Sequence, residues 1–378
     1  MPASLPVDIR IPAHLLPSDG RFGCGPSKVR PEAVVALAAT GTSYLGTSHR
    51  QPGVKSVVGR LRAGLRQLFG LPDGYQVALG NGGSTVFWDL ATFCLIEHRS
   101  QHLSFGEFSS KFAAAAAAAP HLADPDVLAS PPGTHPDARS TLGIDLYALT
   151  HNETSTGVMM DIRRPERTDH GALVAVDATS GAGGLRVDPA QFDAYYFAPQ
   201  KCFGSEGGLW AALLSPAAVE RATRIRDQGR WVPASLDLTI ALDNSRQDQT
   251  YNTPALATVW LFADQVDWML AHGGLEWCAG RCERSADLLY SWAERSAYAQ
   301  PFVAKPDERS RVVGTIDLDD AVPAGTVSKV LRANGIVDTE SYRKLGRNQL
   351  RIGMFPAVEP ADVEALTACV DYIAERLG

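Results

Sequence analysis

The chain has 378 residues and a formal net charge of −7, with 45% apolar and 20% charged residues. A chain of this length suits two unequal domains, and its apolar fraction can build a core without disulfides or metal. The negative charge argues against a nucleic-acid or anionic-membrane surface, although a local cluster of Arg and Lys can still bind small anions.

Cysteine spacing and the N-terminal segment predict a cytoplasmic protein. The six cysteines match no zinc pattern, so we expect reduced structural thiols and no metal. Residues 1–17 contain four prolines and no apolar h-region, which argues against a signal peptide. The longest apolar run, residues 112–119, is too short to cross a bilayer. We therefore expect neither a membrane nor a nucleic-acid partner.

Apolar periodicity predicts an α/β domain over about residues 75–215. Short apolar runs alternate there with helical or loop segments, which is typical of a mostly parallel sheet. Strands are expected at 76–79, 145–149, 172–176, 194–197 and 209–214. Helices are expected at 86–96 and from about 109 to just before Pro120, where seven alanines favour helix.

The pattern changes after about residue 253 and predicts a smaller α+β unit. Helices are expected at 254–271, 275–297, 323–333 and 359–377, and strands at 311–318 and 349–353. Asn252-Thr253-Pro254 predicts a helix start, with Thr253 at the N-cap and Pro254 at the first position. We expect an N-terminal arm over 1–20, a large domain over 21–255 and a small C-terminal domain over 256–378.

A glycine-rich turn follows the first predicted strand. In open α/β sheets ligands bind at the carboxyl ends of the strands. Gly82-Gly83-Ser84-Thr85 lies between a strand and a helix, where backbone N–H groups and the helix dipole favour an anion. The turn lacks the ending of a Walker A loop and the third glycine of a dinucleotide fingerprint. A plain tight turn is the alternative interpretation.

Asp177 and Lys201 follow two successive predicted strands. A carboxylate at such a point can pair with a protonated pyridine nitrogen, and a buried lysine can form a Schiff base with an aldehyde. Each residue alone has a simpler interpretation: a helix cap or turn for Asp177, and a surface lysine for Lys201. The pair, about one βαβ unit apart, is more specific than either residue.

Several motifs in this sequence together resemble one enzyme family. They are Ser48-His49-Arg50, Asn152-Glu153-Thr154, Val176-Asp177-Ala178-Thr179-Ser180, Gln200-Lys201, Asn252-Thr253-Pro254 and Leu350-Arg351-Ile352-Gly353. In this order they resemble the fold-type I pyridoxal phosphate enzymes, specifically the phosphoserine aminotransferases of the class V subgroup. The resemblance covers almost the whole chain. It implies the aspartate aminotransferase-like transferase fold, with a large mixed sheet and a smaller α+β domain.

The resemblance also implies an activity and roles for single residues. The activity is amino transfer from L-glutamate to 3-phosphohydroxypyruvate, giving O-phospho-L-serine and 2-oxoglutarate. Lys201 would bind pyridoxal 5′-phosphate covalently and move the proton, Asp177 would pair with the pyridine nitrogen, and Thr154 would bind the ring hydroxyl. The residues implied for the cofactor phosphate are Ser84, Thr85 and Gln200, with Asn252 and Thr253 from the neighbouring subunit of a homodimer.

The implied substrate site is less regular than the cofactor site. Arg351 would bind the substrate α-carboxylate, which suits a planar bidentate donor. His49 and Arg50 would bind the substrate phosphate, also across the dimer interface. The family's His-Arg pair near the C-terminus is replaced by the segment Arg343-Lys344-Leu345-Gly346-Arg347, so the choice among Arg343, Lys344 and Arg347 stays open.

Two further departures concern the cofactor. Phe108 stands where some members carry a stacked Trp, so it can stack but offers no N–H. Ser84-Thr85 stands where Gly-Arg often occurs, so the contacts to the phosphate depart from the family's pattern. We expect Trp88 and Trp260 to pack in the core.

Simpler structural roles and rival functions stay open at this point. His49-Arg50 can be a solvated turn and Arg351 a surface residue. The nearest rival is an aminotransferase acting on alanine, serine or glyoxylate. A cysteine desulfurase is disfavoured because Cys202, beside Lys201, is badly placed as a mobile nucleophile. A non-catalytic binding protein of the same fold, and added activity in vitamin B6 synthesis, also stay open.

Overall fold

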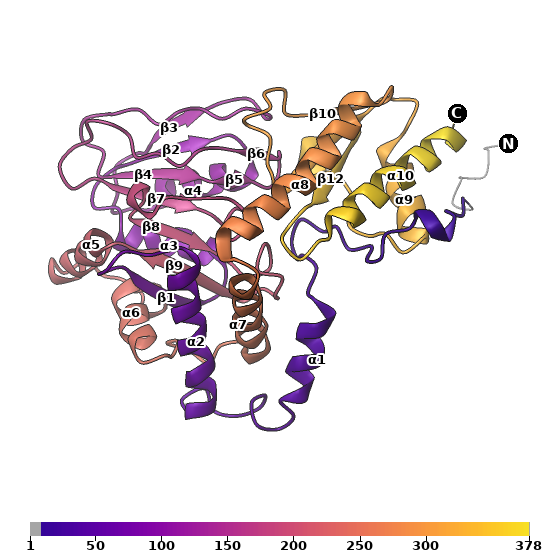
Figure 1. Cartoon of the computed structure of the whole chain (residues 1–378). Coiled ribbons are helices and arrows are strands. Elements are labelled where there is room, and N and C mark those ends of the chain that lie inside the picture. Colours follow the sequence, from indigo (N-terminus) through magenta and orange to yellow (C-terminus); the bar gives the residue numbers. More distant parts are fainter. Residues whose placement is uncertain (1–8, 378) are drawn as a thin grey trace.

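The computed structural model describes residues 9–377, and its largest element is a seven-stranded sheet (Figure 1). The strands are β1 (Gln76–Asn81), β2 (Ser100–Ser104), β3 (Asp126–Ala129), β4 (Leu146–Thr150), β7 (Leu173–Asp177), β8 (Ala194–Phe197) and β9 (Leu209–Leu214). Their order is β1-β9-β8-β7-β4-β2-β3. β9 pairs antiparallel with both neighbours, and the other pairs are parallel. The expected mostly parallel mixed sheet is confirmed.

Successive side chains of each strand point to opposite faces of the sheet, and helices cover both faces. In β8, Tyr195 and Phe197 point to one core, whereas Tyr196 points to the other, as the two-residue period of a strand requires. The first face is covered by α2 (Pro52–Leu68) and α7 (Leu256–Ala271). The second is covered by α3 (Ser84–Cys94), α4 (Glu107–Ala118), α5 (Pro216–Asp227) and α6 (Leu238–Arg246). Burial on both faces explains the continuous apolar runs of β4, β7, β8 and β9, whereas β2 is polar and β3 is only partly buried.

A second core surrounds the antiparallel sheet β10-β11-β12, as expected for an α+β unit. Its elements are β10 (Ala299–Pro301), β11 (Val313–Leu318), β12 (Gln349–Gly353), α8 (Gly274–Arg295), α9 (Ala324–Ala333) and α10 (Pro360–Leu377). Ile11 and Phe22 from the start of the chain pack into this core, whereas α7 packs into the large one. The domain boundaries stay a prediction, and residues 1–8 of the predicted arm lie outside the described part.

The remaining elements are the helix α1, a short hairpin and several 3-10 turns. The β5 (Asn152–Glu153) and β6 (Val158–Met159) strands form a small hairpin, and α1 (Pro31–Ala39) packs beside α7 (Figure 1). Four 3-10 turns complete the set: η1 (Ala13–Leu15), η2 (Pro189–Gln191), η3 (Ala234–Leu236) and η4 (Arg343–Leu345).

Three helix starts differ by two residues from the sequence prediction. Helix α4 begins at Glu107 rather than at about 109, so Phe108 lies in its first turn. Helix α3 begins at Ser84 rather than 86, so Ser84 and Thr85 form its first turn. Helix α7 begins at Leu256 with Ala255 at the N-cap, so the start predicted at Thr253 and Pro254 is wrong. The Thr253 carbonyl instead accepts a hydrogen bond from Asn81 Nδ2 at 3.1 Å, which ties this segment to the end of β1 as a loop.

Within residues 9–377, all six cysteines are buried and free, as expected from their spacing. No group of three or more His, Cys, Asp or Glu residues in that range could hold a metal ion. None of the helices described there combines the length and the apolar character that a membrane span needs.

Candidate active site

A cavity of about 400 Å³ opens at the carboxyl ends of β1, β4, β7 and β8. This size lies in the usual range for cofactor sites. Seven residues that the sequence predicts for cofactor binding line this one cavity: Ser84, Thr85, Phe108, Thr154, Asp177, Gln200 and Lys201. The fold therefore brings together residues from five separate segments of the chain.

Lys201 lies on the turn after β8 and is only 8% exposed, which excludes a surface lysine. Its Nζ donates a hydrogen bond to the Cys24 carbonyl at 2.6 Å and lies 5.9 Å from the centroid of the Phe108 ring. A Cβ at Gly25, where φ is +130°, would collide with the lysine side chain, so this position requires glycine. Burial lowers the pKa of Lys201 to about 8, which makes a neutral, nucleophilic amine available near neutral pH.

Asp177 ends β7 and is 4% exposed. Its Oδ1 accepts hydrogen bonds from Thr179 N at 3.0 Å and Thr179 Oγ1 at 2.6 Å, and its Oδ2 accepts one from Trp88 Nε1 at 2.9 Å. Burial raises the pKa of the carboxyl group, while these three donors and the charge of Lys201 act in the opposite direction. The carboxylate is thereby fixed in orientation on the cavity wall.

The first turn of α3 forms the anion-binding end of the cavity. Gly82 has a φ of +106°, a conformation that favours glycine, and Gly83 at the N-cap has no side chain that could cap the helix. The first N–H groups of a helix lack intrahelical acceptors, so Ser84 and Thr85 offer donors and the positive end of the dipole. Among the described residues, the buried Gln200 Oε1 has no hydrogen-bond partner.

The β5 hairpin positions Thr154 and Phe108. Thr154 Oγ1 and Asn152 Nδ2 both bond Ser180 Oγ, at 2.8 and 2.9 Å. The fully buried carboxylate of Glu153 accepts hydrogen bonds from the N–H groups of Phe108 at 3.1 Å and Ser109 at 2.9 Å. Glu153 therefore caps α4 and holds the Phe108 ring at the cavity.

Arg351 reaches the edge of the cavity from β12 of the second core. Its Nη1 donates to the Thr154 carbonyl at 3.2 Å, and its guanidinium lies 5.3 Å from the Tyr342 ring centroid. Its buried Nε has no hydrogen-bond partner within residues 9–377. A half-buried guanidinium with an unpaired N–H is suited to bind a carboxylate.

Two neighbouring segments that carry predicted site residues lie outside this cavity. They contain His49, Arg50, Asn252 and Thr253. Arg50 Nη1 donates to Gln249 Oε1 at 3.0 Å, which joins the segment of His49 and Arg50 to the loop that carries Asn252 and Thr253. Asn252 and Thr253 are exposed, and Asn252 lines a different cavity, beside Tyr251. The two segments expected to reach a neighbouring subunit thus lie together on one surface.

The basic side chains of residues 343–347, which include η4, contact different partners. Lys344 forms an ion pair with Glu107 at 2.5 Å, next to Phe108. Arg347 pairs with Asp317 and stacks over Phe302, with 4.6 Å from the guanidinium carbon to the ring centroid. Arg343 is exposed. Arg347 is therefore paired with β11 of the second core, whereas Lys344 lies beside the Phe108 segment that lines the cavity.

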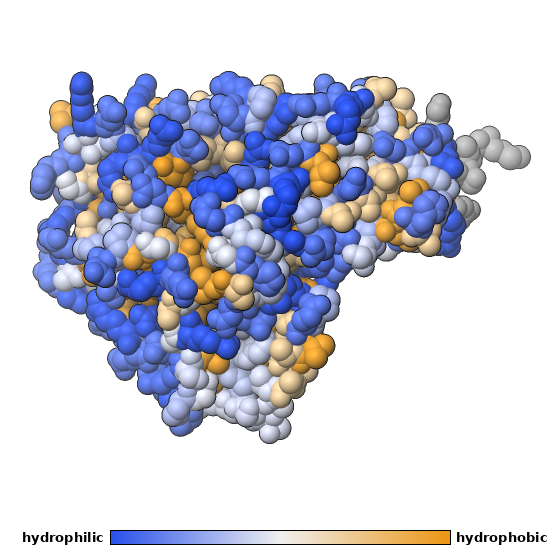
Figure 2. Space-filling model, in the orientation of Figure 1, coloured by the Kyte–Doolittle hydropathy of each residue, from blue (hydrophilic) through white to orange (hydrophobic). Residues whose placement is uncertain are grey.

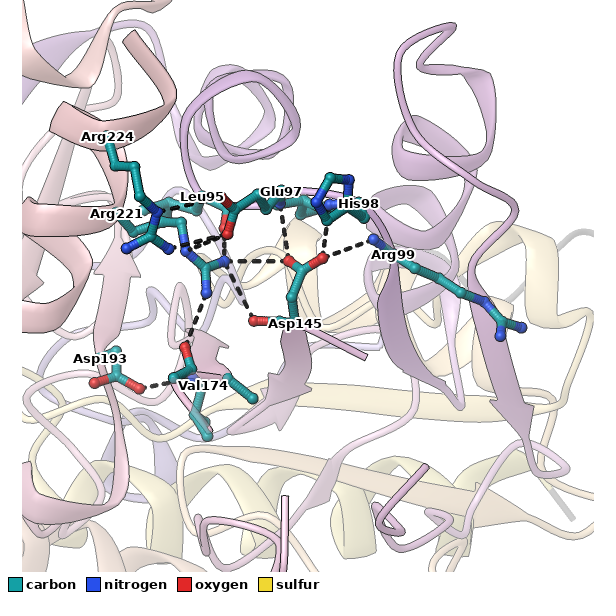
Figure 3. Close-up of polar contacts among 12 residues, drawn as sticks. Leu95, Glu97, His98, Arg99, Asp145, Val174, Asp193, Arg221 and Arg224 are labelled. Atoms are coloured by element: carbon teal, nitrogen blue, oxygen red, sulfur yellow. Dashed lines mark hydrogen bonds and ion pairs between the residues drawn. The ribbon is translucent and has the colours of Figure 1, made fainter. Parts of the chain in front are cut away.

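A larger cavity, of about 500 Å³, lies at the opposite, amino-terminal edge of the sheet and contains an ion network (Figure 3). Arg221 is 3% exposed and pairs with Asp145 at 3.1 Å and with Glu97 at 3.3 Å. Asp145 also accepts hydrogen bonds from three consecutive backbone N–H groups, at residues 97–99, and Glu97 pairs with Arg224. These charges satisfy one another, so this cavity shows no comparable set of reactive groups.

Several residues that line the cavity have no role assigned from the sequence, among them Trp88, Thr179 and Asn152. Trp88 packs in the core as expected, but its indole N–H also binds Asp177. Thr179 and Asn152 stood inside the recognised motifs, so the motif itself was the available signal. No sequence signal indicates the contact of Trp88 with Asp177, because it joins a helix to a strand 89 residues away.

The lining fits a phosphorylated pyridine aldehyde. An uncapped helix start faces an anion, a buried carboxylate suits a ring nitrogen, and a buried amine suits an aldehyde. The side-chain amide of Gln200, whose Oε1 has no partner among the described residues, can offer its Nε2 as a donor to an anion.

Comparison with known proteins supports the same conclusion. A family model described as aminotransferase class-V matches residues 137–365. The chain is 61% identical over 370 residues to the phosphoserine aminotransferase of a Nocardioides species, covering 98% of this chain and 99% of that protein. It is 58% identical over 368 residues to the phosphoserine aminotransferase of Rhodococcus jostii, covering 97% and 98%. The crystal structure of a phosphoserine aminotransferase from Cytophaga hutchinsonii superposes with a TM-score of 0.85 at 23% identity, covering 95% of this chain and 100% of that one.

Proposed function

The chain belongs to the phosphoserine aminotransferases of the class V aminotransferase family, and we propose how its own residues carry out that reaction. The reaction transfers the amino group of L-glutamate to 3-phosphohydroxypyruvate, giving O-phospho-L-serine and 2-oxoglutarate, with pyridoxal 5′-phosphate as cofactor. One observation carries the residue assignment: the buried amine of Lys201 and the buried carboxylate of Asp177 line the same cavity. Cys202 is fully buried, which argues against a desulfurase nucleophile.

Six residues besides Lys201 would hold the cofactor within one subunit. Asp177 would bind the ring nitrogen, Thr154 the ring hydroxyl, and Phe108 one face of the ring. Ser84 and Thr85 would bind the phosphate through the first N–H groups of α3, and Gln200 would add a side-chain contact. When bound, pyridoxal phosphate supplies an electron sink that stabilises negative charge at the substrate Cα.

Lys201 would then act on the substrate proton. Its buried amine, with a pKa lowered to about 8, would move a proton between the substrate Cα and C4′ of the cofactor. Arg351 would bind the α-carboxylate and so orient the Cα–H bond toward Lys201. Both half-reactions use this one site, so ping-pong kinetics follow.

A homodimer would complete the site. Support comes from the surface that joins His49 and Arg50 to Asn252 and Thr253, since these residues do not line the cavity of their own subunit. On the neighbouring helix α1, Val34 and Val35 are 50% and 70% exposed, and an apolar group is visible over α1 (Figure 2). Exposed apolar side chains beside polar site residues are typical of a subunit interface. From the second subunit, Asn252 and Thr253 would contact the cofactor phosphate.

The substrate phosphate would be bound by basic residues from two sides. His49 and Arg50 would come from the partner subunit, and Arg343 and Lys344 from the second core of the same subunit. Lys344 would exchange its ion pair with Glu107 for the phosphate. We also propose a cytoplasmic location, supported by six buried cysteines that remain unpaired in the described chain.

An assay with two acceptors tests the proposed substrate. Purified protein with glutamate and pyridoxal phosphate is given 3-phosphohydroxypyruvate or hydroxypyruvate, and 2-oxoglutarate formation is followed. The phosphorylated acceptor should have a kcat/KM at least about a hundredfold higher, since it gains charge-assisted hydrogen bonds to several basic groups. Equal use of both acceptors would favour an alanine, serine or glyoxylate aminotransferase. Vitamin B6 precursors can be tested as further acceptors in the same assay.

A further inference from the structure

Trp88 connects the two ends of the cavity through one face of α3. It lies four residues after Ser84, and residues spaced by four share a helix face. Ser84 faces the anion-binding end of the cavity, and Trp88 lies about 6 Å further along the axis, at a rise of about 1.5 Å per residue. The neighbouring Phe87 points into the core instead and stacks on Tyr196 with a centroid distance of 4.2 Å.

The polar atom of Trp88 is directed at the catalytic carboxylate. Its Nε1 donates to Asp177 Oδ2 at 2.9 Å, and both side chains belong to residues only 4% exposed. Thr179 holds only the other oxygen, Oδ1. Trp88 is therefore the donor that fixes Oδ2 among the described residues. A phenylalanine would fill much of the same space but would leave that oxygen without this donor.

We propose that Trp88 is a positioning residue for the transamination reaction: its indole N–H holds Asp177 ionised and oriented toward the ring nitrogen of bound pyridoxal phosphate. The inference rests on the proposed role of Asp177. Burial raises the pKa of Asp177, and the Trp88 hydrogen bond is one of the contacts that oppose this rise. Without the N–H, the carboxyl group would stay protonated to higher pH and would bind the protonated ring nitrogen less well.

The test compares two ligands that differ at the ring nitrogen alone. Affinities of the apoprotein for pyridoxal phosphate and for its 1-deaza analogue, in which C–H replaces the ring nitrogen, are measured for wild type and Trp88→Phe. Trp260→Phe, a partly buried tryptophan on α7 away from the cavity, is the matched control. We expect Trp88→Phe to weaken pyridoxal phosphate binding about tenfold, in line with a lost hydrogen bond to a charged group. Binding of the deaza analogue should change less than about twofold, and the control should change neither affinity.

A second variant covers the case in which Trp88→Phe does not fold. Replacing Trp88 with 3-benzothienylalanine exchanges only the N–H for sulfur and keeps the volume of the side chain. In either variant the acid limb of the kcat profile should also move to higher pH. Equal weakening of both ligands would show that Trp88 only packs, and unchanged affinity for both would also overturn the proposal. If wild-type protein neither binds pyridoxal phosphate nor transaminates, the proposed function fails instead.

Discussion

The two edges of the seven-stranded sheet bury charge in opposite ways. At the amino-terminal edge, Arg221 is surrounded by the carboxylates of Asp145 and Glu97 (Figure 3). At the carboxyl edge, Lys201 is nearly as buried as Arg221. Its Nζ, however, donates a hydrogen bond to a neutral acceptor, the Cys24 carbonyl. Burial away from water lowers the pKa of Lys201 to about 8. Removing one partner of a compensated buried ion pair destabilises the fold, whereas an uncompensated buried charge is available for chemistry.

The volume of the cavity does not distinguish the two edges of the sheet. The cavity at the amino-terminal edge is the larger, at about 500 Å³ against about 400 Å³. Helix α3 connects them, since its first turn faces the proposed cofactor phosphate and its last carbonyl groups lie at the ion network. Arg221 Nη1 donates to Leu95 O at 2.9 Å, and Arg230 Nη1 donates to Ile96 O at 2.6 Å. These cations complement the negative end of the helix dipole, as an anion would complement the positive end.

The largest effect should come from the carboxyl edge. Lys201→Ala removes the amine that is proposed to bind the cofactor and move the Cα proton, so kcat should fall about a thousandfold or more. The free energy of unfolding should not decrease, because a poorly compensated buried amine is removed. Steady-state kinetics and urea unfolding measure the two quantities. Lys329→Ala, at an exposed position on α9, is the control. Near-normal turnover in Lys201→Ala would remove the basis of the comparison.

The converse result is expected at the amino-terminal edge. Arg221→Leu leaves Asp145 and Glu97 without their shared cation, so the free energy of unfolding should drop by about 3 kcal/mol. Turnover of the folded fraction should stay within about twofold of wild type. Arg226→Leu, an exposed neighbour on α5 whose partner is Asp227, should change stability by less than about 1 kcal/mol. A selective loss of turnover in Arg221→Leu would mean that this edge also serves catalysis.

Arg50→Ala tests the residues proposed to come from the second subunit. It should raise KM for 3-phosphohydroxypyruvate about tenfold and leave KM for glutamate nearly unchanged, because glutamate carries no phosphate. Arg60→Ala, which removes an exposed arginine of α2 paired with Asp267, serves as control. Equal changes in both KM values would refute the role of Arg50.

The pKa of Lys201 gives the smallest and most specific effect. Its folded-state pKa is lowered from 10.5 to about 8, so the neutral amine becomes the major form above pH 8. The rate at which the apoprotein takes up pyridoxal phosphate should therefore rise about tenfold from pH 7 to pH 9. Stopped-flow absorbance measures this rate. A midpoint near the ordinary lysine value would indicate an amine that is not desolvated.

Much of the fold was predictable because its strands are buried on both faces. The runs at 194–197, 209–214 and 349–353 match β8, β9 and β12 residue for residue, since continuous apolar segments bounded by polar turns leave little ambiguity. The start of α3 was placed two residues late because Ser84 and Thr85 are polar and read as part of the turn. The false start at Thr253 followed a valid capping pattern, which the contact from Asn81 overrides.

The site was predictable as far as strand ends and motifs reach. Asp177 and Lys201 follow strands whose carboxyl ends meet at one edge, so their shared cavity follows from topology. The Trp88 contact with Asp177 and the pairing of Arg347 with Asp317 are tertiary contacts, and no local pattern specifies them.

Covalent mapping of the cofactor would test the central assignment most directly. The protein is incubated with pyridoxal phosphate, reduced with borohydride, digested, and the modified peptide is identified by mass spectrometry. Modification of Lys201 at one group per chain, lost in Lys201→Ala, is the predicted result. Modification at another lysine, or none at stoichiometric level, would contradict the account.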